Sequence, residues 1–241
     1  MSAPFQHRRF AVDDDGNDLG YLLSLPDGYQ DGPGQWPLLL FLHGALERGE
    51  DPAVLAAHGP VRQIAEGARL PFVVLAPQCP AHSSWVAELS SLAALLAEVE
   101  REVRIDPDRR YVTGLSMGGT GSWALAARYP RRFAAAVPVC GSWLRESAPR
   151  LTAVPVWTFH GEEDEVIPVS HTERLVDALR ALGGPVRFTR YPGVGHDSWT
   201  RTYDDPEVYD WLLAQSRPGD PTLRTVPTPT APTADSHVEP A

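Results

Sequence analysis

The chain has 241 residues, of which 43% are hydrophobic, so it can form one large domain or two small ones with a core of ordinary size. It carries 31 acidic and 21 basic residues, for a formal net charge of −10, and every basic residue is an arginine. An acidic chain repels phosphate backbones and anionic lipids, so its composition argues against nucleic acid or membrane partners.

The amino-terminal sequence and the cysteines indicate in which cellular compartment we expect the protein. Met1 leads into polar sequence without an apolar signal core, and the longest apolar run, Leu38–Leu42, is far shorter than the roughly 20 residues of a membrane span. Cys79 and Cys140 are too few for a disulfide framework and lack metal-ligand spacing. We therefore expect a soluble, cytoplasmic protein that needs no metal or other cofactor.

The composition changes near the carboxyl end. Residues 216–241 hold six prolines and five threonines and show no apolar period. Such a segment cannot bury enough surface to offset the entropy of ordering it. We expect one folded domain over residues 1–215, followed by a disordered tail over residues 216–241.

Within the folded part, short apolar runs alternate with longer segments of helical period. The middle runs are continuously apolar, which is typical of parallel strands covered on both faces. The alternation predicts an α/β fold, with a mostly parallel sheet between two layers of helices and an antiparallel hairpin at one edge. The predicted strands are Arg9–Val12, Tyr21–Leu25, Leu38–Leu42, Phe72–Ala76, Tyr111–Thr113, Ala135–Val139, Val156–Phe159 and Arg187–Tyr191. The predicted helices are Pro52–Glu66, Leu89–Val103, Met117–Arg128, Pro168–Leu182 and Pro206–Ala214.

The pentapeptide Gly114–Gly118 fits the G-x-S-x-G pattern of a nucleophile elbow. Alone this signal is weak, since a chain of this composition contains such a pentapeptide by chance about once in ten cases. Its context strengthens it, because the elbow needs a strand before it and a helix after it. Tyr111–Thr113 and Met117–Arg128 supply both. Ser116 is therefore the candidate nucleophile.

A carboxylate and a histidine follow two later strands. Asp164 comes after the predicted strand ending at Phe159, and His196 comes after the one ending at Tyr191. Loops at the carboxyl ends of parallel strands gather at one edge of the sheet. A serine hydroxyl needs an imidazole to take its proton, and the imidazole needs a carboxylate to fix its tautomer. The order Ser116, Asp164, His196 is the order this architecture uses.

Other residues compete for these roles. Glu162, Glu163 and Glu165 flank Asp164, and each could face the histidine. His82 is a further candidate for the cleft. The remaining histidines are predicted to be structural, as for His43 and His160 at the ends of buried strands, or solvated, as for His7, His58, His171 and His237.

The strand Leu38–Leu42 runs directly into His43-Gly44-Ala45. A central strand that ends in this way can supply a backbone N–H to an oxyanion, together with the N–H of the residue after the nucleophile. The predicted donors are Ala45 and Met117, and the alternative is a plain turn. Gly119–Ala124 matches a dinucleotide fingerprint, but it lies inside a helix already begun, so we reject nucleotide binding.

Five segments together resemble the α/β-hydrolase superfamily, in the carboxylesterase branch related to dienelactone hydrolases and phospholipase/carboxylesterase proteins. The resemblance implies the α/β-hydrolase fold, the triad Ser116, Asp164 and His196, and an oxyanion hole at Ala45 and Met117. Dienelactone hydrolases carry cysteine as nucleophile, so the serine here does not imply their substrate. Leu46 stands where similar sequences have glycine, and leucine disfavours positive φ. The segments are Phe41–Gly49, Leu75–Pro80, Tyr111–Gly119, Phe159–Asp164 and Tyr191–Trp199.

The sequence therefore predicts a serine carboxylesterase that acts on a small-molecule ester through an acyl-enzyme. The alternatives are a catalytically inactive binding protein on the same fold, or a thioesterase or peptidase with the same triad. Only about a dozen residues separate Val139 from Val154, too few for a cap domain. Trp85, Trp143 and Trp199 are predicted to line the open cleft, which favours short-chain or aromatic esters.

Overall fold

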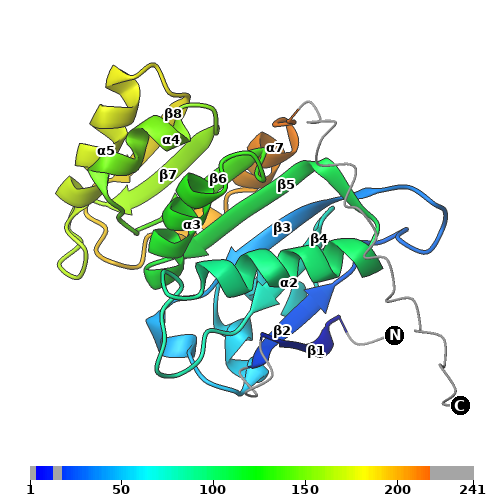
Figure 1. The fold of residues 1–241 in the computed structure, drawn as a ribbon. Coiled ribbons are helices and arrows are strands. Elements are labelled where there is room, and N and C mark those ends of the chain that lie inside the picture. The colour runs from blue at the N-terminus through cyan, green and yellow to red at the C-terminus, as the bar shows by residue number, and fades with distance from the viewer. Residues whose placement is uncertain (1–3, 13–17, 218–241) are drawn as a thin grey trace, which may run out of the picture.

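The computed structural model describes residues 4–12 and 18–217, and most of the predicted tail lies outside them. Eight strands form one sheet in the order β1-β2-β4-β3-β5-β6-β7-β8 (Figure 1). β1 and β2 form the predicted antiparallel hairpin, β2 also pairs antiparallel with β4, and the remaining pairs are parallel. The strands are β1 Gln6–Ala11, β2 Asp18–Ser24, β3 Trp36–Leu42, β4 Val73–Pro77, β5 Ile105–Leu115, β6 Ala135–Val139, β7 Val156–Gly161 and β8 Val186–Tyr191.

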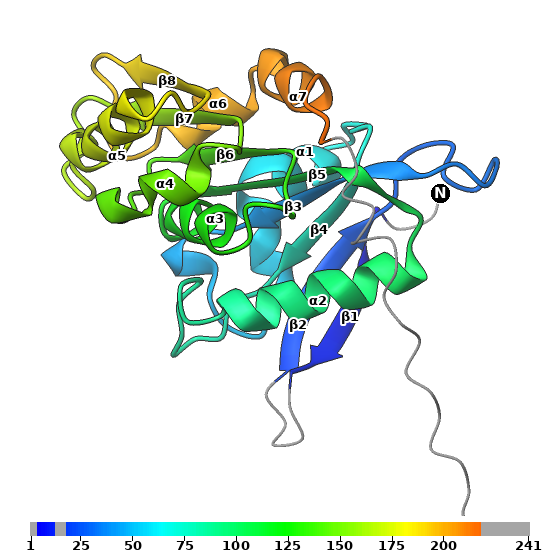
Figure 2. The ribbon, with the colours of Figure 1, turned by 45° about the horizontal axis from the view of Figure 1, so that its top comes forward.

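Helices cover both faces of the sheet, which confirms the predicted fold class (Figure 2). Helices α2, α3, α4 and α5 pack on one face, and α1, α6 and α7 pack on the other. The α-helices are α1 Gly59–Ala65, α2 Leu89–Glu102, α3 Met117–Arg128, α4 Ala148–Leu151, α5 Val169–Ala181, α6 Trp199–Tyr203 and α7 Pro206–Leu213; the 3₁₀ helices are η1 Ala45–Glu47, η2 Pro52–Ala57 and η3 Arg145–Ser147. None of the described helices combines the length and apolar character needed to cross a membrane.

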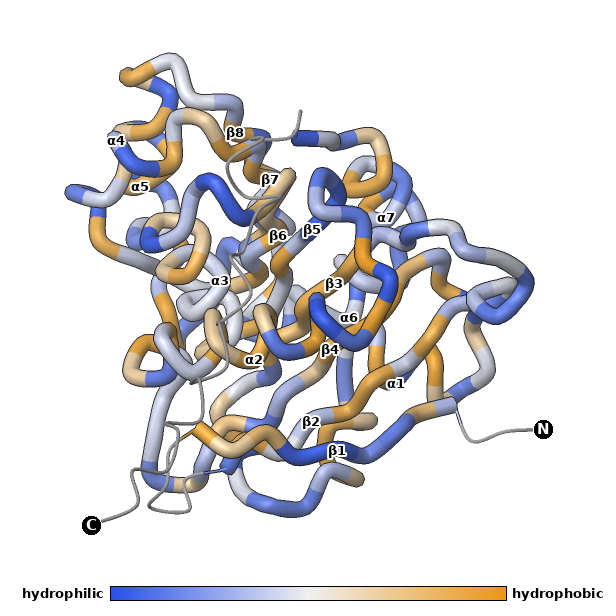
Figure 3. The backbone as a smooth tube through the Cα atoms, turned by 45° about the vertical axis from the view of Figure 1, so that its right-hand side comes forward, coloured by the Kyte–Doolittle hydropathy of each residue, from blue (hydrophilic) through white to orange (hydrophobic). Residues whose placement is uncertain are grey.

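Strand β3 shows why its sequence is continuously apolar. Leu38, Leu40 and Leu42 point into the core under α2 and α3, while Leu39 and Phe41 point into the core on the opposite face. Successive side chains of a strand alternate between faces, so a strand buried on both sides needs apolar residues throughout. Each such side chain contributes about 1.5–3 kcal/mol on burial. Figure 3 shows the resulting orange interior strands beneath hydrophilic surface segments.

The predicted helix Pro52–Glu66 is wrong as one element, because the chain breaks between η2 and α1. His58 is extended and Gly59 has φ +62°. A side chain on Gly59 would place its Cβ 2.6 Å from the ring of Phe41, so the turn here fits only glycine. The break turns α1 back onto the sheet beside β3.

Strand β5 is longer than predicted. It begins at Ile105, six residues before the apolar run, and its pairing with β3 shifts register between Trp36 and Leu38. The polar segment Asp106–Arg109 contains Pro107, which cannot donate to the ladder and is confined to such irregular positions. Periodicity therefore identified only the regular part of this strand.

Candidate active site

Ser116 lies in a tight turn between β5 and α3, with φ 54° and ψ −116°. This backbone region is unfavourable for a residue with a side chain and persists only where the surroundings enforce it. Two glycines after Ser116 allow the close packing that enforces this backbone conformation. A Cβ on Gly118 would lie 1.8 Å from the carbonyl oxygen of Leu42, and one on Gly119 would lie 2.3 Å from that of Val139. Helix α3 therefore starts directly against the ends of β3 and β6.

The structure brings Ser116, His196 and Asp164 together from three separate loops. Ser116 Oγ lies 2.9 Å from His196 Nε2, and His196 Nδ1 lies 2.7 Å from Asp164 Oδ2. A carboxylate can only accept, so Nδ1 carries the proton and Nε2 is left to accept the serine proton. The neighbouring residues Glu162, Glu163 and Glu165 are exposed, so none of these alternatives takes the position of the acid.

Asp164 is buried, and its charge is compensated by donors on all sides. Its Oδ1 accepts from the N–H groups of Val166 and Ile167, each at 2.9 Å. Burial by itself would raise the pKa of this carboxyl, but the hydrogen bonds from His196 and from these two N–H groups outweigh it and hold the pKa below its ordinary value. Asp164 therefore stays ionised and can stabilise an imidazolium at His196.

A second histidine contacts the same carboxylate. His160 is fully buried, with Nε2 3.0 Å from Asp164 Oδ2 and 2.8 Å from the carbonyl oxygen of Ile167. Its Nδ1 lies 2.9 Å from the hydroxyl of Thr172. Burial lowers the pKa of His160 despite the nearby carboxylate, so the ring is neutral with its proton on Nε2. The sequence predicted a structural histidine, and its contact with the acid came only with the structure.

The two predicted oxyanion donors are the first residues of two neighbouring helices. Ala45 opens η1 and Met117 opens α3, so neither N–H has an acceptor within its own helix. A Cβ on Gly44 would lie 2.9 Å from Leu115 Cδ1, which shows how closely the loop after β3 packs on the elbow. Leu46 does not distort this loop. Among the described residues only Ser116 and Cys140 combine a side chain with positive φ, and the Leu46 side chain is 95% exposed.

His43 holds the loop that follows β3 in place through its hydrogen bonds. Its Nε2 accepts from the N–H of Cys79 at 2.9 Å, and its Nδ1 donates to the carbonyl oxygen of Gly44 at 2.5 Å. Its own carbonyl oxygen accepts from Trp85 Nε1 at 2.9 Å. Burial lowers the pKa of His43 from 6.5 to about 4, so the ring is neutral and its tautomer fixed by these two bonds.

The three tryptophans do not form the predicted wall. Trp85 is fully buried against Gly121 and His43, so its expected place in the cleft is wrong, and its ring instead supports the oxyanion loop. Trp143 is half-buried and packs against the core that α2, α3, α4 and α5 cover. Trp199 packs edge-on against His196, with ring centroids 5.4 Å apart. Trp199 therefore contacts the triad through the ring of His196.

Two residues lie near the site although the sequence did not predict them there. Glu47 is buried, with one carboxylate oxygen 3.6 Å from His58 Nε2 and the other 3.8 Å from His43 Nδ1. His58, predicted to be solvated, stacks edge-on against Trp199 at 5.5 Å. No sequence pattern links these residues, because they meet only through the turn at Gly59. The described part of the chain groups no three His, Cys, Asp or Glu side chains around a possible metal position.

Comparisons with known proteins find esterases and a thioesterase that are similar to this chain. Acyl-protein thioesterase 1 of Gibberella zeae is 28% identical over 123 residues, which are 47% of this chain and 52% of the relative. Bifunctional acetylxylan esterase/xylanase XynS20E of Neocallimastix patriciarum is 26% identical over 60% of this chain and 22% of its own length. The chain thus spans about half, or less, of these relatives. The crystal structure of a thermostable esterase is 36% identical, with a TM-score of 0.77 over 89% of this chain and 64% of that one.

The family assignment rests on a longer match. The model of the dienelactone hydrolase family matches residues 81–211, more than half of the chain. The matched range contains all three triad residues and the whole elbow. The chain belongs to the dienelactone hydrolase family.

Proposed function

We propose that the protein is a serine hydrolase that cleaves carboxylic esters through an acyl-enzyme on Ser116. The observation that carries this proposal is the unbroken line of contacts from Ser116 Oγ to His196 to Asp164, at 2.9 and 2.7 Å. These distances are those required for proton transfer from the nucleophile to a base that is itself oriented by a carboxylate.

Each residue has a defined part in the reaction. Ser116 Oγ attacks the ester carbonyl carbon while His196 Nε2 takes its proton, and the N–H groups of Ala45 and Met117 bind the oxyanion. The proton then passes from Nε2 to the departing alcohol, which leaves the acyl group on Ser116. Water attacks this acyl group as His196 Nε2 takes its proton, and the same proton then passes to Ser116 Oγ as the carboxylic acid departs. Asp164 stays ionised and stabilises the imidazolium in both halves.

The rim of the site favours small apolar acyl groups. Leu46, Leu144 and Val166 are 95%, 58% and 68% exposed, and they follow the carboxyl ends of β3, β6 and β7, the edge that holds the triad. Apolar side chains this exposed are available to contact a ligand. Between β6 and β7 the chain forms only η3 and α4, without an inserted domain. We infer an open site for short-chain or aromatic esters of small molecules.

A thioesterase is the second candidate, because one relative is named acyl-protein thioesterase 1 and the same acyl-enzyme chemistry serves a thioester. A cytoplasmic location remains part of the proposal, and it is supported by two buried cysteines that are free thiols.

Labelling with a fluorophosphonate probe tests the activity directly. Wild type should be modified at Ser116, and Ser116→Ala should not. A matched panel of oxygen esters and thioesters of the same acyl group then decides between the two substrate classes. A folded wild type that neither reacts with the probe nor turns over any ester would show a binding protein instead.

A further inference from the structure

A cavity lies at the opposite end of the sheet from Ser116. It has a volume of about 850 Å³ and is formed by the start of β5, the end of α3, part of α2 and the segment before β6. Arg110, in its wall, stands six residues before Ser116 on β5, or about 20 Å along the strand. Ligand sites generally occupy about 300–1,000 Å³, so this cavity can hold a small organic molecule.

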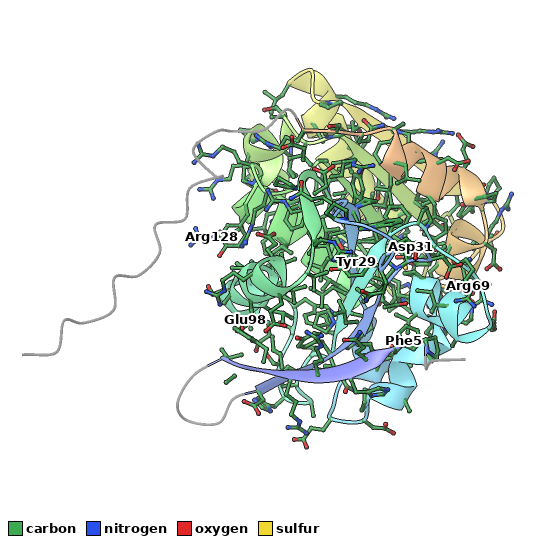
Figure 4. The ribbon with its side chains drawn as sticks, turned by 90° about the vertical axis from the view of Figure 1, so that its right-hand side faces the viewer. Phe5, Tyr29, Asp31, Arg69, Glu98 and Arg128 are labelled. Atoms are coloured by element: carbon green, nitrogen blue, oxygen red, sulfur yellow. The ribbon has the colours of Figure 1, made fainter. Side chains whose placement is uncertain are left out.

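Arginines dominate the wall of this cavity. Among the described residues that line it, Glu100 is the one carboxylate, and it is shared between Arg110 at 2.9 Å and Arg132 at 3.4 Å. Figure 4 shows Arg128 close to α2, the helix that carries Glu100. In a chain of net charge −10, this is an unusual concentration of positive charge. The six lining arginines are Arg101, Arg110, Arg128, Arg131, Arg132 and Arg150.

Part of this charge has a structural explanation. Arg101, Arg128 and Arg150 lie in the last turns of α2, α3 and α4, where a cation balances the helix dipole. Each helix end carries only about half a negative charge, and Arg101 is also paired with Glu98. Helix ends and the two glutamates therefore offset only part of the positive charge on Arg101, Arg110, Arg128, Arg132 and Arg150.

Arg110 is the observation that points to a ligand. The residue is only 7% exposed, and its Nε is buried without an acceptor among the described residues, although its NH1 binds Glu100. A buried guanidinium N–H without a partner is costly, and such groups almost always have an acceptor. A carboxylate or phosphate oxygen in the cavity would supply one, with the bidentate geometry that arginine favours.

Apart from the arginines, Gln35 and Glu100, the wall is mostly apolar. Ile105, Pro130 and the side chain of Tyr129 contribute to it, together with alanines of α2 and α3. We propose that this cavity is a binding site, separate from the triad, for an organic anion whose carboxylate or phosphate meets the arginines and whose apolar body lies against Ile105 and Tyr129.

Calorimetric titration of the full chain with three matched probes tests the proposal. 1-Naphthoate and 1-naphthyl phosphate carry the two anionic groups, and 1-naphthamide is their neutral counterpart. At least one anion should bind with a Kd of about 1 mM or tighter. Its affinity should fall as NaCl rises from about 50 to about 500 mM, because salt screens the charges. The two anions then show which oxygen chemistry the site prefers. Failure of both to bind, or equal binding of the amide, would refute the site.

Paired variants locate the binding. Arg128→Gln combined with Arg150→Gln removes two exposed arginines of the wall, and affinity should drop at least about tenfold. Arg180→Gln is the control, because Arg180 is also exposed and in the last turn of a helix, α5, but does not line the cavity. Equal affinity in the double variant and the wild type would place the anion elsewhere, for example at the triad.

The carboxyl-terminal segment is the remaining possible occupant. Arg217 donates to the carbonyl oxygen of Pro130, a residue of the cavity wall, at 2.6 Å. The sequence that follows Arg217 includes Asp220, Asp235 and Glu239, so its carboxylates are alternative partners for the arginines. The titration is therefore repeated with a chain that ends at Arg217. Similar affinity in both chains supports a site for a free anion. Binding seen only in the shortened chain would show that this segment fills the cavity, and would overturn the proposal.

Discussion

Acidification should destabilise the protein through His43, the histidine that holds the oxyanion loop. Its Nε2 accepts a hydrogen bond from the N–H of Cys79 in a buried site. If Nε2 were protonated, its N–H and the N–H of Cys79 would face each other as two donors without an acceptor. Burial lowers the pKa of this ring from 6.5 to about 4. The folded protein keeps His43 neutral while the unfolded chain binds a proton below pH 6.5. The stability that His43 contributes is therefore fully present above pH 6.5 and is lost as the pH falls toward 4.

The size of the effect follows from the two pKa values. One pKa unit corresponds to about 1.4 kcal/mol, and the linkage relation gives a loss of about 2 kcal/mol between pH 7 and pH 5 from His43 alone. His160 adds to the loss in the same direction, because burial lowers its pKa as well. The pKa of Asp164 lies below its ordinary value, so its contribution is retained in this window and lost only at lower pH.

Urea unfolding at pH 7 and pH 5 measures this difference. Wild type should lose about 2 kcal/mol more than His43→Gln, which lacks the titrating group, over the same interval. His171→Gln, at an exposed position of α5, should behave like wild type. NMR titration of the wild-type ring provides an independent reading, since His43 should remain the neutral Nδ1–H form at pH 5. Identical losses in wild type and His43→Gln, or a ring that is charged at pH 5, would refute the reasoning.

Three further outcomes are expected. Ser116→Ala should lower ester turnover by about 10³-fold or more with an unchanged circular dichroism spectrum; substantial turnover by the folded variant would place the nucleophile elsewhere. Across p-nitrophenyl esters, kcat/KM should peak at acyl chains of about two to six carbons, because an open rim can bury few further methylenes at about 0.8 kcal/mol each; equal or better turnover of long chains would contradict an open site. Removing residues 218–241 should leave the melting temperature and ester turnover unchanged, since a segment rich in proline and threonine buries little surface; a clear loss of either would show that it packs on the domain.

Much of the sheet and the triad could be predicted from local sequence. β3 and β6 are continuously apolar because both faces are covered, and the elbow has its own pattern of glycines. Strand ends in an α/β sheet converge on one edge, so the order of Ser116, Asp164 and His196 was sufficient to expect them together. These features depend on residues close in sequence, or on a rule that applies to the whole fold.

The remaining features depend on contacts that no local pattern encodes. The position of Trp85 after β4 suggested a cleft residue. Its indole instead lies in the core, where Nε1 donates to the carbonyl oxygen of His43 and the side chain packs against Gly121. The contact of His160 with Asp164 requires the chain to turn back after β7. Short helices such as α6 hold too few residues to show a period, so they could not be predicted at all.

The position of the triad is set mainly by backbone, so we expect that Ser116 can be changed without unfolding the domain. Ser116 and Cys140 both have positive φ, at the ends of neighbouring strands β5 and β6. Hydrogen bonds join each strand end to the next across the carboxyl edge, from the serine loop to the loops that carry the acid and the base. The donors and acceptors are Ser116 and Val139 at 3.0 Å, Cys140 and Phe159 at 2.8 Å, Glu162 and Tyr191 at 3.1 Å, and Glu163 and Val194 at 2.9 Å. None of these bonds uses a triad side chain. Because these backbone bonds hold the loops before any substrate arrives, the proposed proton acceptor and oxyanion donors need not reorganise, which is the condition under which such groups accelerate a reaction most.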